Sequence, residues 1–180
     1  VGIQLMVTVL DRLGRTSQAN SLRGMARTLE SYSDIPDKWI NELMDFCYDP
    51  YQLMSGGGFA VYAGNVERGI ALMNRAIQYD PDNAMAHYQL GMVLEQDGQI
   101  ERALSSYEKA SKLNPNLSDA WLKPANMYIN AGHVKRGDEL LAQGLSNNPT
   151  SPALYLLYGE RLYEKKLFRE SISALKRSIE

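Results

Sequence analysis

The sequence predicts an all-α fold of stacked helix-turn-helix hairpins, because several kinds of residue return at one spacing of 34 positions. Prolines and glycines set the period: Pro81, Pro115 and Pro149, and Gly64, Gly98 and Gly132. Small residues recur in three columns: Gly57, Gly91, Ala125 and Gly159; Gly69, Ala103, Gly137 and Ser171; Ala76, Ala110, Gly144 and Ser178. A bulky column holds Met73, Tyr107, Leu141 and Leu175. Small residues let two helices approach closely and bulky ones fill the layer between hairpins, so these columns together indicate stacked hairpins.

Residues 84–117 show one hairpin most clearly. Positions i, i+3, i+4 and i+7 mark one face of a first helix: His87, Leu90, Gly91 and Leu94. A second stripe at helical spacing follows: Ile100, Ala103, Tyr107 and Ala110. Asp97-Gly98-Gln99 interrupts the pattern, and Gly98 is expected to adopt a positive φ in the turn. Asn114-Pro115 ends the second helix, because proline disfavours helix in the residue before it.

The order of residues in this hairpin resembles the tetratricopeptide repeat, whose signature has the same length. The resemblance implies a right-handed superhelix, or α-solenoid, of stacked helix-turn-helix hairpins. It divides most of the chain into repeats over 50–83, 84–117, 118–151 and 152–180, the last of which stops within its second helix.

The first 49 residues are interpreted as a weaker copy followed by an insertion. Residues 1–32 are predicted to form a degenerate hairpin, because Gly14, Ala19 and Ala26 keep the internal offsets of the later repeats. Residues 33–49 are predicted to form an inserted acidic amphipathic helix. Its apolar face has residues at intervals of four: Ile35, Trp39, Leu43 and Cys47. We expect Trp39 to fill the depression left by the glycines at 56–58.

Two features depart from the regular repeat. The glycines at 56–58 fall inside a first helix, where two of them each cost about 1 kcal/mol relative to alanine. Pro124 falls inside the first helix of 118–151 and removes one backbone hydrogen bond, so it is expected to kink or delay that helix.

Composition excludes several classes of function. The net charge of −2 offers no general attraction to nucleic acid or to an anionic membrane. Cys47 is the only cysteine, so neither an intrachain disulfide nor a thiolate-rich metal site can form. No apolar run approaches the length needed to span a bilayer, and no membrane insertion is expected. The sequence does not begin with Met, and we expect it to be a fragment of a longer chain.

No catalytic, cofactor or metal site is predicted. His87 and His133 have no cysteine or second histidine at metal-ligand spacing. His133 follows a turn, and His87 shares a column with Trp121 and Tyr155, so we interpret the first as an exposed turn residue and the second as a packing residue. The sequence lacks a Gly-x-Ser-x-Gly motif, and its glycine run lacks the Lys-Ser/Thr of a phosphate-binding loop. A Ser/His/Asp triad assembles in space and stays open at this level.

In the family that this chain resembles, ligands lie along the first helices of successive hairpins, on the concave surface. The resemblance implies a peptide-binding groove lined by Tyr51, Met54, Tyr62, Met85, Tyr88, Met92, Leu122 and Asn126. An exposed apolar strip usually marks a partner site, and methionine adapts to varied partners. The alternative is that these residues are covered by the inserted helix or only pack locally. The Lys, Arg and Asn cluster with which some family members grip chaperone carboxylates is incomplete here, because only Lys123 and Asn126 match it.

These observations favour a non-catalytic protein–protein interaction module that binds a peptide or a helix in its concave groove. The alternative is a regulatory or assembly segment of a larger enzyme or membrane-attached protein. The expected partner is a protein or peptide, with no nucleic acid. Because the chain stops in a second helix, the face around Leu175 and Ile179 is expected to be open and to support self-association.

Overall fold

The computed structural model describes residues 7, 10–12, 14–26 and 44–179. The chain divides into two compact units, Val1–Cys47 and Tyr48–Glu180. In the first unit, α2 (Thr16–Ala26) follows a turn in which Gly14 has a φ of 71°. Arg23 stands in the bulky column of the predicted degenerate repeat, yet it is exposed and pairs with Asp11. A polar pair therefore stands where the later repeats bury a large side chain.

The predicted insertion at 33–49 lies mostly outside the described residues, Trp39 included. At its described end, residue 44 is helical, residues 45–46 form a turn, and residues 47–49 belong to no helix. The prediction of a helix through residue 49 is therefore wrong at this end. The reason is that Asp49 caps the following helix: its carboxylate accepts hydrogen bonds from the backbone N–H groups of Tyr51 and Gln52, at 2.8 and 3.1 Å.

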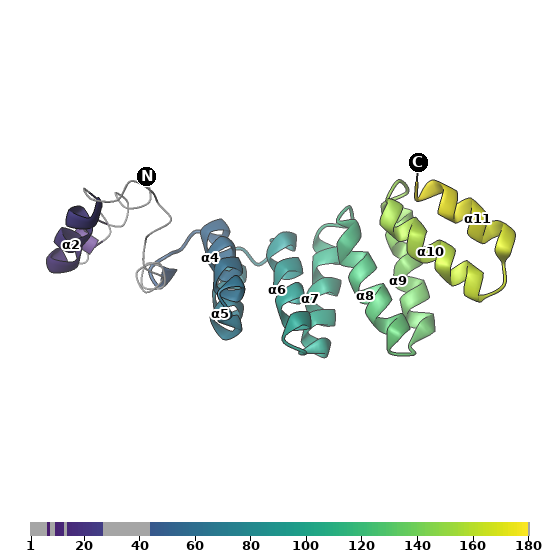
Figure 1. Ribbon diagram of the computed structural model, residues 1–180, viewed down its shortest axis with the longest axis horizontal. Coiled ribbons are helices and arrows are strands. Elements are labelled where there is room, and N and C mark those ends of the chain that lie inside the picture. The colour runs from purple at the N-terminus through teal and green to yellow at the C-terminus, as the bar shows by residue number, and fades with distance from the viewer. Residues whose placement is uncertain (1–6, 8–9, 13, 27–43, 180) are drawn as a thin grey trace. The chain divides into compact units, whose positions relative to one another are not determined.

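The second unit is built from helices that pair in chain order (Figure 1). The pairs are α4 (Pro50–Tyr62) with α5 (Val66–Tyr79), α6 (Ala84–Gln96) with α7 (Ile100–Leu113), α8 (Ser118–Asn130) with α9 (Val134–Asn147), and α10 (Pro152–Glu164) with α11 (Phe168–Arg177). Each pair also contacts the next one along the chain. The prediction of an all-α fold of paired helical hairpins is thus confirmed.

Glycine residues in a left-handed conformation turn the chain between the paired helices. Gly64, Gly98 and Gly132 have φ values of 86°, 75° and 84°, which confirms the expectation for Gly98. The last hairpin has Lys166 at the equivalent position, with a φ of 60°. A residue with a side chain pays about 1–2 kcal/mol in this region of conformational space, so Lys166 is strained where the three glycines are not.

Exchanging residues at this turn position should change stability in opposite directions. Gly98→Val should lower the free energy of unfolding by about 1–2 kcal/mol, because a Cβ at Gly98 meets open space and the effect comes from φ alone. Lys166→Gly should raise it by about 0.5–1 kcal/mol, since glycine relieves the strain but loses more entropy on folding. Urea unfolding of each variant beside the wild type measures both effects. Equal midpoints for all three proteins would show that φ at this position carries no cost.

Small residues on first helices face the bulky column of the second helices. A Cβ added to Gly91 would lie 2.7 Å from the ring of Tyr107, and one added to Gly159 would lie 2.7 Å from Leu175. At Gly57, a Cβ would approach Met73 at 3.1 Å and the carbonyl oxygen of Gly69 at 3.2 Å. The bulky column therefore packs directly onto the small column of its own hairpin, and this close approach depends on the missing side chain.

The glycine run and Pro124 do not break their helices. Helix α4 continues through residues 56–58, and α8 begins at Ser118 without delay and contains Pro124 in its interior, where the ring is buried. The expected delay of α8 is therefore wrong. Tertiary packing compensates for the low helix propensity of glycine and for the backbone hydrogen bond that proline cannot donate.

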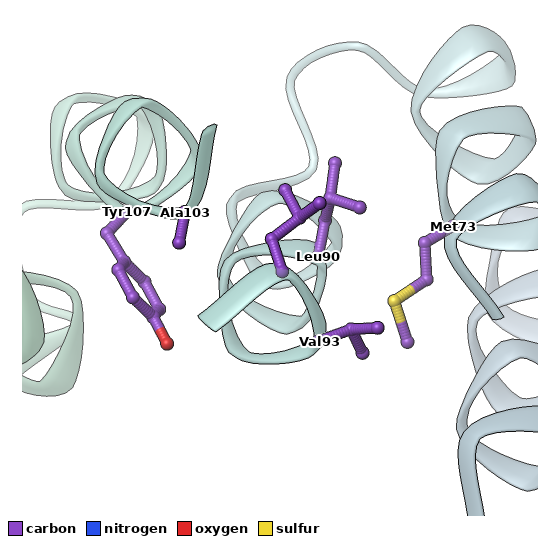
Figure 2. Packing of buried hydrophobic residues seen from close by; sticks show 6 residues of the cluster. Met73, Leu90, Val93, Ala103 and Tyr107 are labelled. Carbon is purple, nitrogen blue, oxygen red and sulfur yellow. The ribbon is translucent and has the colours of Figure 1, made fainter. Parts of the chain in front are cut away.

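Two buried clusters join neighbouring hairpins. The first comprises Met73, Leu90, Val93, Leu94, Ala103 and Tyr107, and so joins α5, α6 and α7 (Figure 2). The second comprises Trp121, Ala125, Leu140, Leu141, Leu154 and Leu157 from α8, α9 and α10. Each hairpin thus completes its core with side chains from the next, as expected for stacked repeats. Within the described ranges, every helix is too short or too polar to cross a bilayer.

Candidate functional site

The predicted groove residues lie on α4, α6 and α8, the first helices of three successive hairpins. We call the accessible members the first-helix strip: Tyr51, Tyr62, Met85, Tyr88, Met92, Leu122 and Asn126. Tyr62 is 93% exposed, and Met85 and Met92 are 44% and 39% exposed. Tyr88 and Leu122 are half-buried and pack against the two core clusters. Helices α4 and α6 contact each other, and an ion pair joins α6 to α8.

Met54 does not belong to this surface. Its side chain is only 6% exposed, so the prediction that it lines the groove is corrected. Met54 lies on the side of α4 that also buries Leu53, Gly57 and Ala60, the side turned toward the core. A ligand on the strip would therefore meet Tyr51 rather than Met54 on this helix.

Tyr88 of the strip packs against a polar cluster formed by Tyr107, Glu95 and Lys123. The Tyr107 hydroxyl, on a fully buried side chain, donates a hydrogen bond of 2.6 Å to Glu95 Oε2. The same oxygen lies 3.5 Å from Lys123 Nζ on α8. The ring of Tyr88 packs against that of Tyr107, with 5.6 Å between centroids. Burial and the carboxylate of Glu95 raise the pKa of Tyr107, so its hydroxyl remains a donor at physiological pH.

Acidic side chains flank the half-buried tyrosine of the strip. Burial raises the pKa of Tyr88, and the negative charges of Asp119 and Glu95 raise it further. Asp119 and Asn126 are both exposed on α8, and Glu160 is exposed on α10. Exposed tyrosine and methionine side chains on α4 and α6 are therefore followed by exposed carboxylates on α8 and α10.

The prediction that His133 is an exposed residue after a turn is confirmed, and His87 has a hydrogen-bond partner in the backbone. His87 Nε2 lies 3.0 Å from the carbonyl oxygen of Pro81, and one repeat later Trp121 Nε1 donates to the carbonyl oxygen of Pro115 at 2.9 Å. His133 is exposed and begins α9 as its cap residue. In the part of the chain that the structure describes, no group of three His, Cys, Asp or Glu side chains is arranged to hold a metal ion.

A second polar cluster was not found from the sequence. Arg161 is 7% exposed, and its Nε donates a hydrogen bond of 3.0 Å to Asp138 Oδ1 on α9. Lys165 donates to the other oxygen of Asp138 at 2.7 Å, and Glu164 pairs with Arg161 as well. Asp138 is partly buried, which alone would raise its pKa, but the hydrogen bonds from Lys165 and Arg161 outweigh burial and lower the pKa.

Fold and strip together define a helical repeat protein whose first helices present accessible apolar side chains. Two overlapping segments, residues 60–118 and 94–160, match tetratricopeptide repeat families. The chain belongs to the tetratricopeptide repeat family, which confirms the resemblance drawn from the 34-residue columns. Proteins of this family are generally non-catalytic and generally mediate protein–protein interactions.

Several named proteins are similar to this chain in sequence or in fold. The antiviral innate immune response effector IFIT1 of Homo sapiens is 24% identical over 157 aligned positions, which cover 72% of this chain and 33% of that protein. The photosystem I assembly protein Ycf3 of Synechococcus sp. (strain CC9605) is 33% identical over 85 positions, which cover 46% of this chain and 49% of that protein. The chain thus spans about a third to a half of the length of these relatives. A crystal structure of MamA matches with a TM-score of 0.66 and 19% identity over 79% of this chain and 84% of that one, which supports the fold alone.

Proposed function

We propose that this chain is a non-catalytic interaction module that holds a peptide or a helix of another protein against the first-helix strip. The observation that carries the proposal is the exposure of Met85 and Met92 on α6, on either side of the half-buried Tyr88. Their spacing places all three on one face of the helix. Apolar side chains grouped on an accessible face favour contact with a partner, and methionine can repack around different shapes.

The support beneath the strip favours a defined binding surface. Tyr88 rests on Tyr107, and Tyr107 is fixed by its hydrogen bond to Glu95. A ring held in this way loses little conformational entropy when a ligand covers it, so more of the contact energy remains for affinity. An amphipathic helix, with apolar residues at i, i+3 or i+4, and i+7, is one ligand that such a face fits.

The second candidate is an assembly or regulatory segment of a larger enzyme or membrane-attached protein. One observation favours it: the chain covers about half of a relative that is itself named an assembly protein. In that case the strip would bind a subunit under assembly, and the contact surface would be the same.

Truncating the two methionines should weaken peptide binding. Peptides are selected from a random library displayed on phage against the full chain, and their affinities are measured by fluorescence anisotropy. Met85→Ala/Met92→Ala should reduce affinity by about tenfold, because shortening two half-exposed apolar side chains removes roughly 1.4 kcal/mol of burial.

A matched double variant separates the strip from general surface contact. Ile100 and Ile172 are exposed apolar residues on α7 and α11, at 46% and 57%. Ile100→Ala/Ile172→Ala should leave the same affinities unchanged. If both double variants weaken binding equally, or if neither does, the peptides bind elsewhere and the proposal fails.

A further inference from the structure

Charge is distributed unevenly along the first helices. Helix α4 has no charged side chain, and α6 has Glu95 as its one carboxylate and no Lys or Arg. The next first helices carry Asp119 and Lys123 on α8, and Glu160, Arg161 and Glu164 on α10. The accessible face thus changes from uncharged and aromatic at α4 to charged at α8 and α10.

The cations of helices α8 and α10 are already paired. Lys123 Nζ lies 3.5 Å from Glu95 Oε2. Arg161 is buried and held by Asp138 and Glu164. A ligand that approached α8 or α10 would therefore find these positive charges largely neutralised by neighbouring carboxylates.

Two exposed carboxylates on the same helices have no such partner. Within the described ranges, neither Asp119 nor Glu160 forms an ion pair or a side-chain hydrogen bond. Asp119 stands four residues before Lys123 and seven before Asn126, so it shares their face of α8. Asp119 also stands 34 residues after Met85, and Glu160 stands 34 residues after Asn126, so each carboxylate occupies the position of a strip residue in a later hairpin. Two fixed negative charges therefore continue the line of the strip.

We infer that the occupant of the strip is a peptide or amphipathic helix that places apolar side chains against Met85, Tyr88 and Met92 and lysine or arginine side chains against Asp119 and Glu160. This inference rests on the proposed function and adds the chemistry of the partner. The apolar contact supplies most of the affinity. The carboxylates select a basic partner over an acidic one, since like charges across an interface are unfavourable and opposite charges speed association.

Three synthetic peptides test the inference on the full chain. They share one apolar face of leucine and phenylalanine and carry lysine, glutamine or glutamate at their polar positions. The lysine peptide should bind most tightly and the glutamate peptide least. Asp119→Asn/Glu160→Gln should weaken the lysine peptide by about three- to tenfold and leave the glutamine peptide unchanged, because exposed ion pairs are individually weak. Raised salt should reduce this difference.

Two further variants sharpen the test. Lys123→Gln should strengthen binding of the lysine peptide by about two- to fivefold, because it removes a cation of α8 next to the strip and releases the Glu95 carboxylate from its ion pair. Glu101→Gln/Glu139→Gln removes two exposed carboxylates from the second helices α7 and α9 and should have no effect. Thermal melts of each variant check that the fold is kept, since Asp119 also lies in the first turn of α8.

The outcomes separate the two proposals. If the lysine peptide binds no more tightly than the glutamate peptide, or if both carboxylate variants act equally on it, the inferred chemistry of the partner is overturned. If Met85→Ala/Met92→Ala still weakens library-selected peptides in that case, the strip remains a binding site and only its charge preference is wrong.

Discussion

Replacing Tyr107 by alanine should lower the free energy of unfolding by about 3–5 kcal/mol. The side chain is fully buried, and it belongs to the cluster that joins α5, α6 and α7. A Cβ at Gly91 would lie 2.7 Å from the Tyr107 ring, so the ring fills the space that this glycine leaves, and truncation of Tyr107 would open a cavity there. Urea unfolding at neutral pH, followed by circular dichroism, measures the change.

Tyr107→Phe is the matched control for the ring alone. It keeps the packing and removes the 2.6 Å hydrogen bond to Glu95, so it should cost about 1 kcal/mol. If the alanine variant lost no more stability than the phenylalanine variant, the ring would not be a core element, and the packing of the small and bulky columns would be misassigned.

Repetition explains why so much of the fold could be predicted from the sequence. Gly98 is one of three glycines at one turn position, and each has a positive φ. Gly91 belongs to the small column and Tyr107 to the bulky column, and the two residues pack on each other. One position must be small because the other is large. A position that must be small or bulky in every repeat can be recognised from a single sequence, because the repeats of the chain can be compared with one another.

Features that occur in a single repeat were harder to predict. Met54 was placed in the groove from its column, but its burial depends on the neighbours of α4 in this one hairpin. The bond between Glu95 and Tyr107 joins two helices and has no spacing signature. The contact of Trp39 with the glycines at 56–58 stays a prediction, because Trp39 lies outside the described ranges.

The buried ion pair did leave a signal in the sequence. Arg161 stands in a column with Phe59, Val93 and Met127, and Asp138 stands in one with Ile70, Leu104 and Ile172. Each of these apolar columns thus holds one charged residue, the aspartate on α9 and the arginine on α10, and the two form an ion pair in the structure. A charge in an otherwise apolar column predicts a buried group that requires a partner.

Removing the carboxylate of that pair should therefore cost more than a surface ion pair is worth. Asp138→Asn leaves the buried guanidinium of Arg161 with Glu164 alone, and we expect a loss of about 2–3 kcal/mol at pH 7, less than the 3–5 kcal/mol for a cation left with no partner. Because the folded state lowers the pKa of Asp138, its stabilisation is present above the unfolded value near 4 and is lost as pH falls through the folded value. Wild type and variant should thus differ most at neutral pH and converge in acid, which urea unfolding between pH 7 and pH 3 measures.

Glu139→Gln on the same helix removes an exposed carboxylate 3.6 Å from Arg136 and should change stability by less than about 0.5 kcal/mol at every pH. A loss for Asp138→Asn that stayed constant across this range would show that Asp138 acts through packing rather than charge.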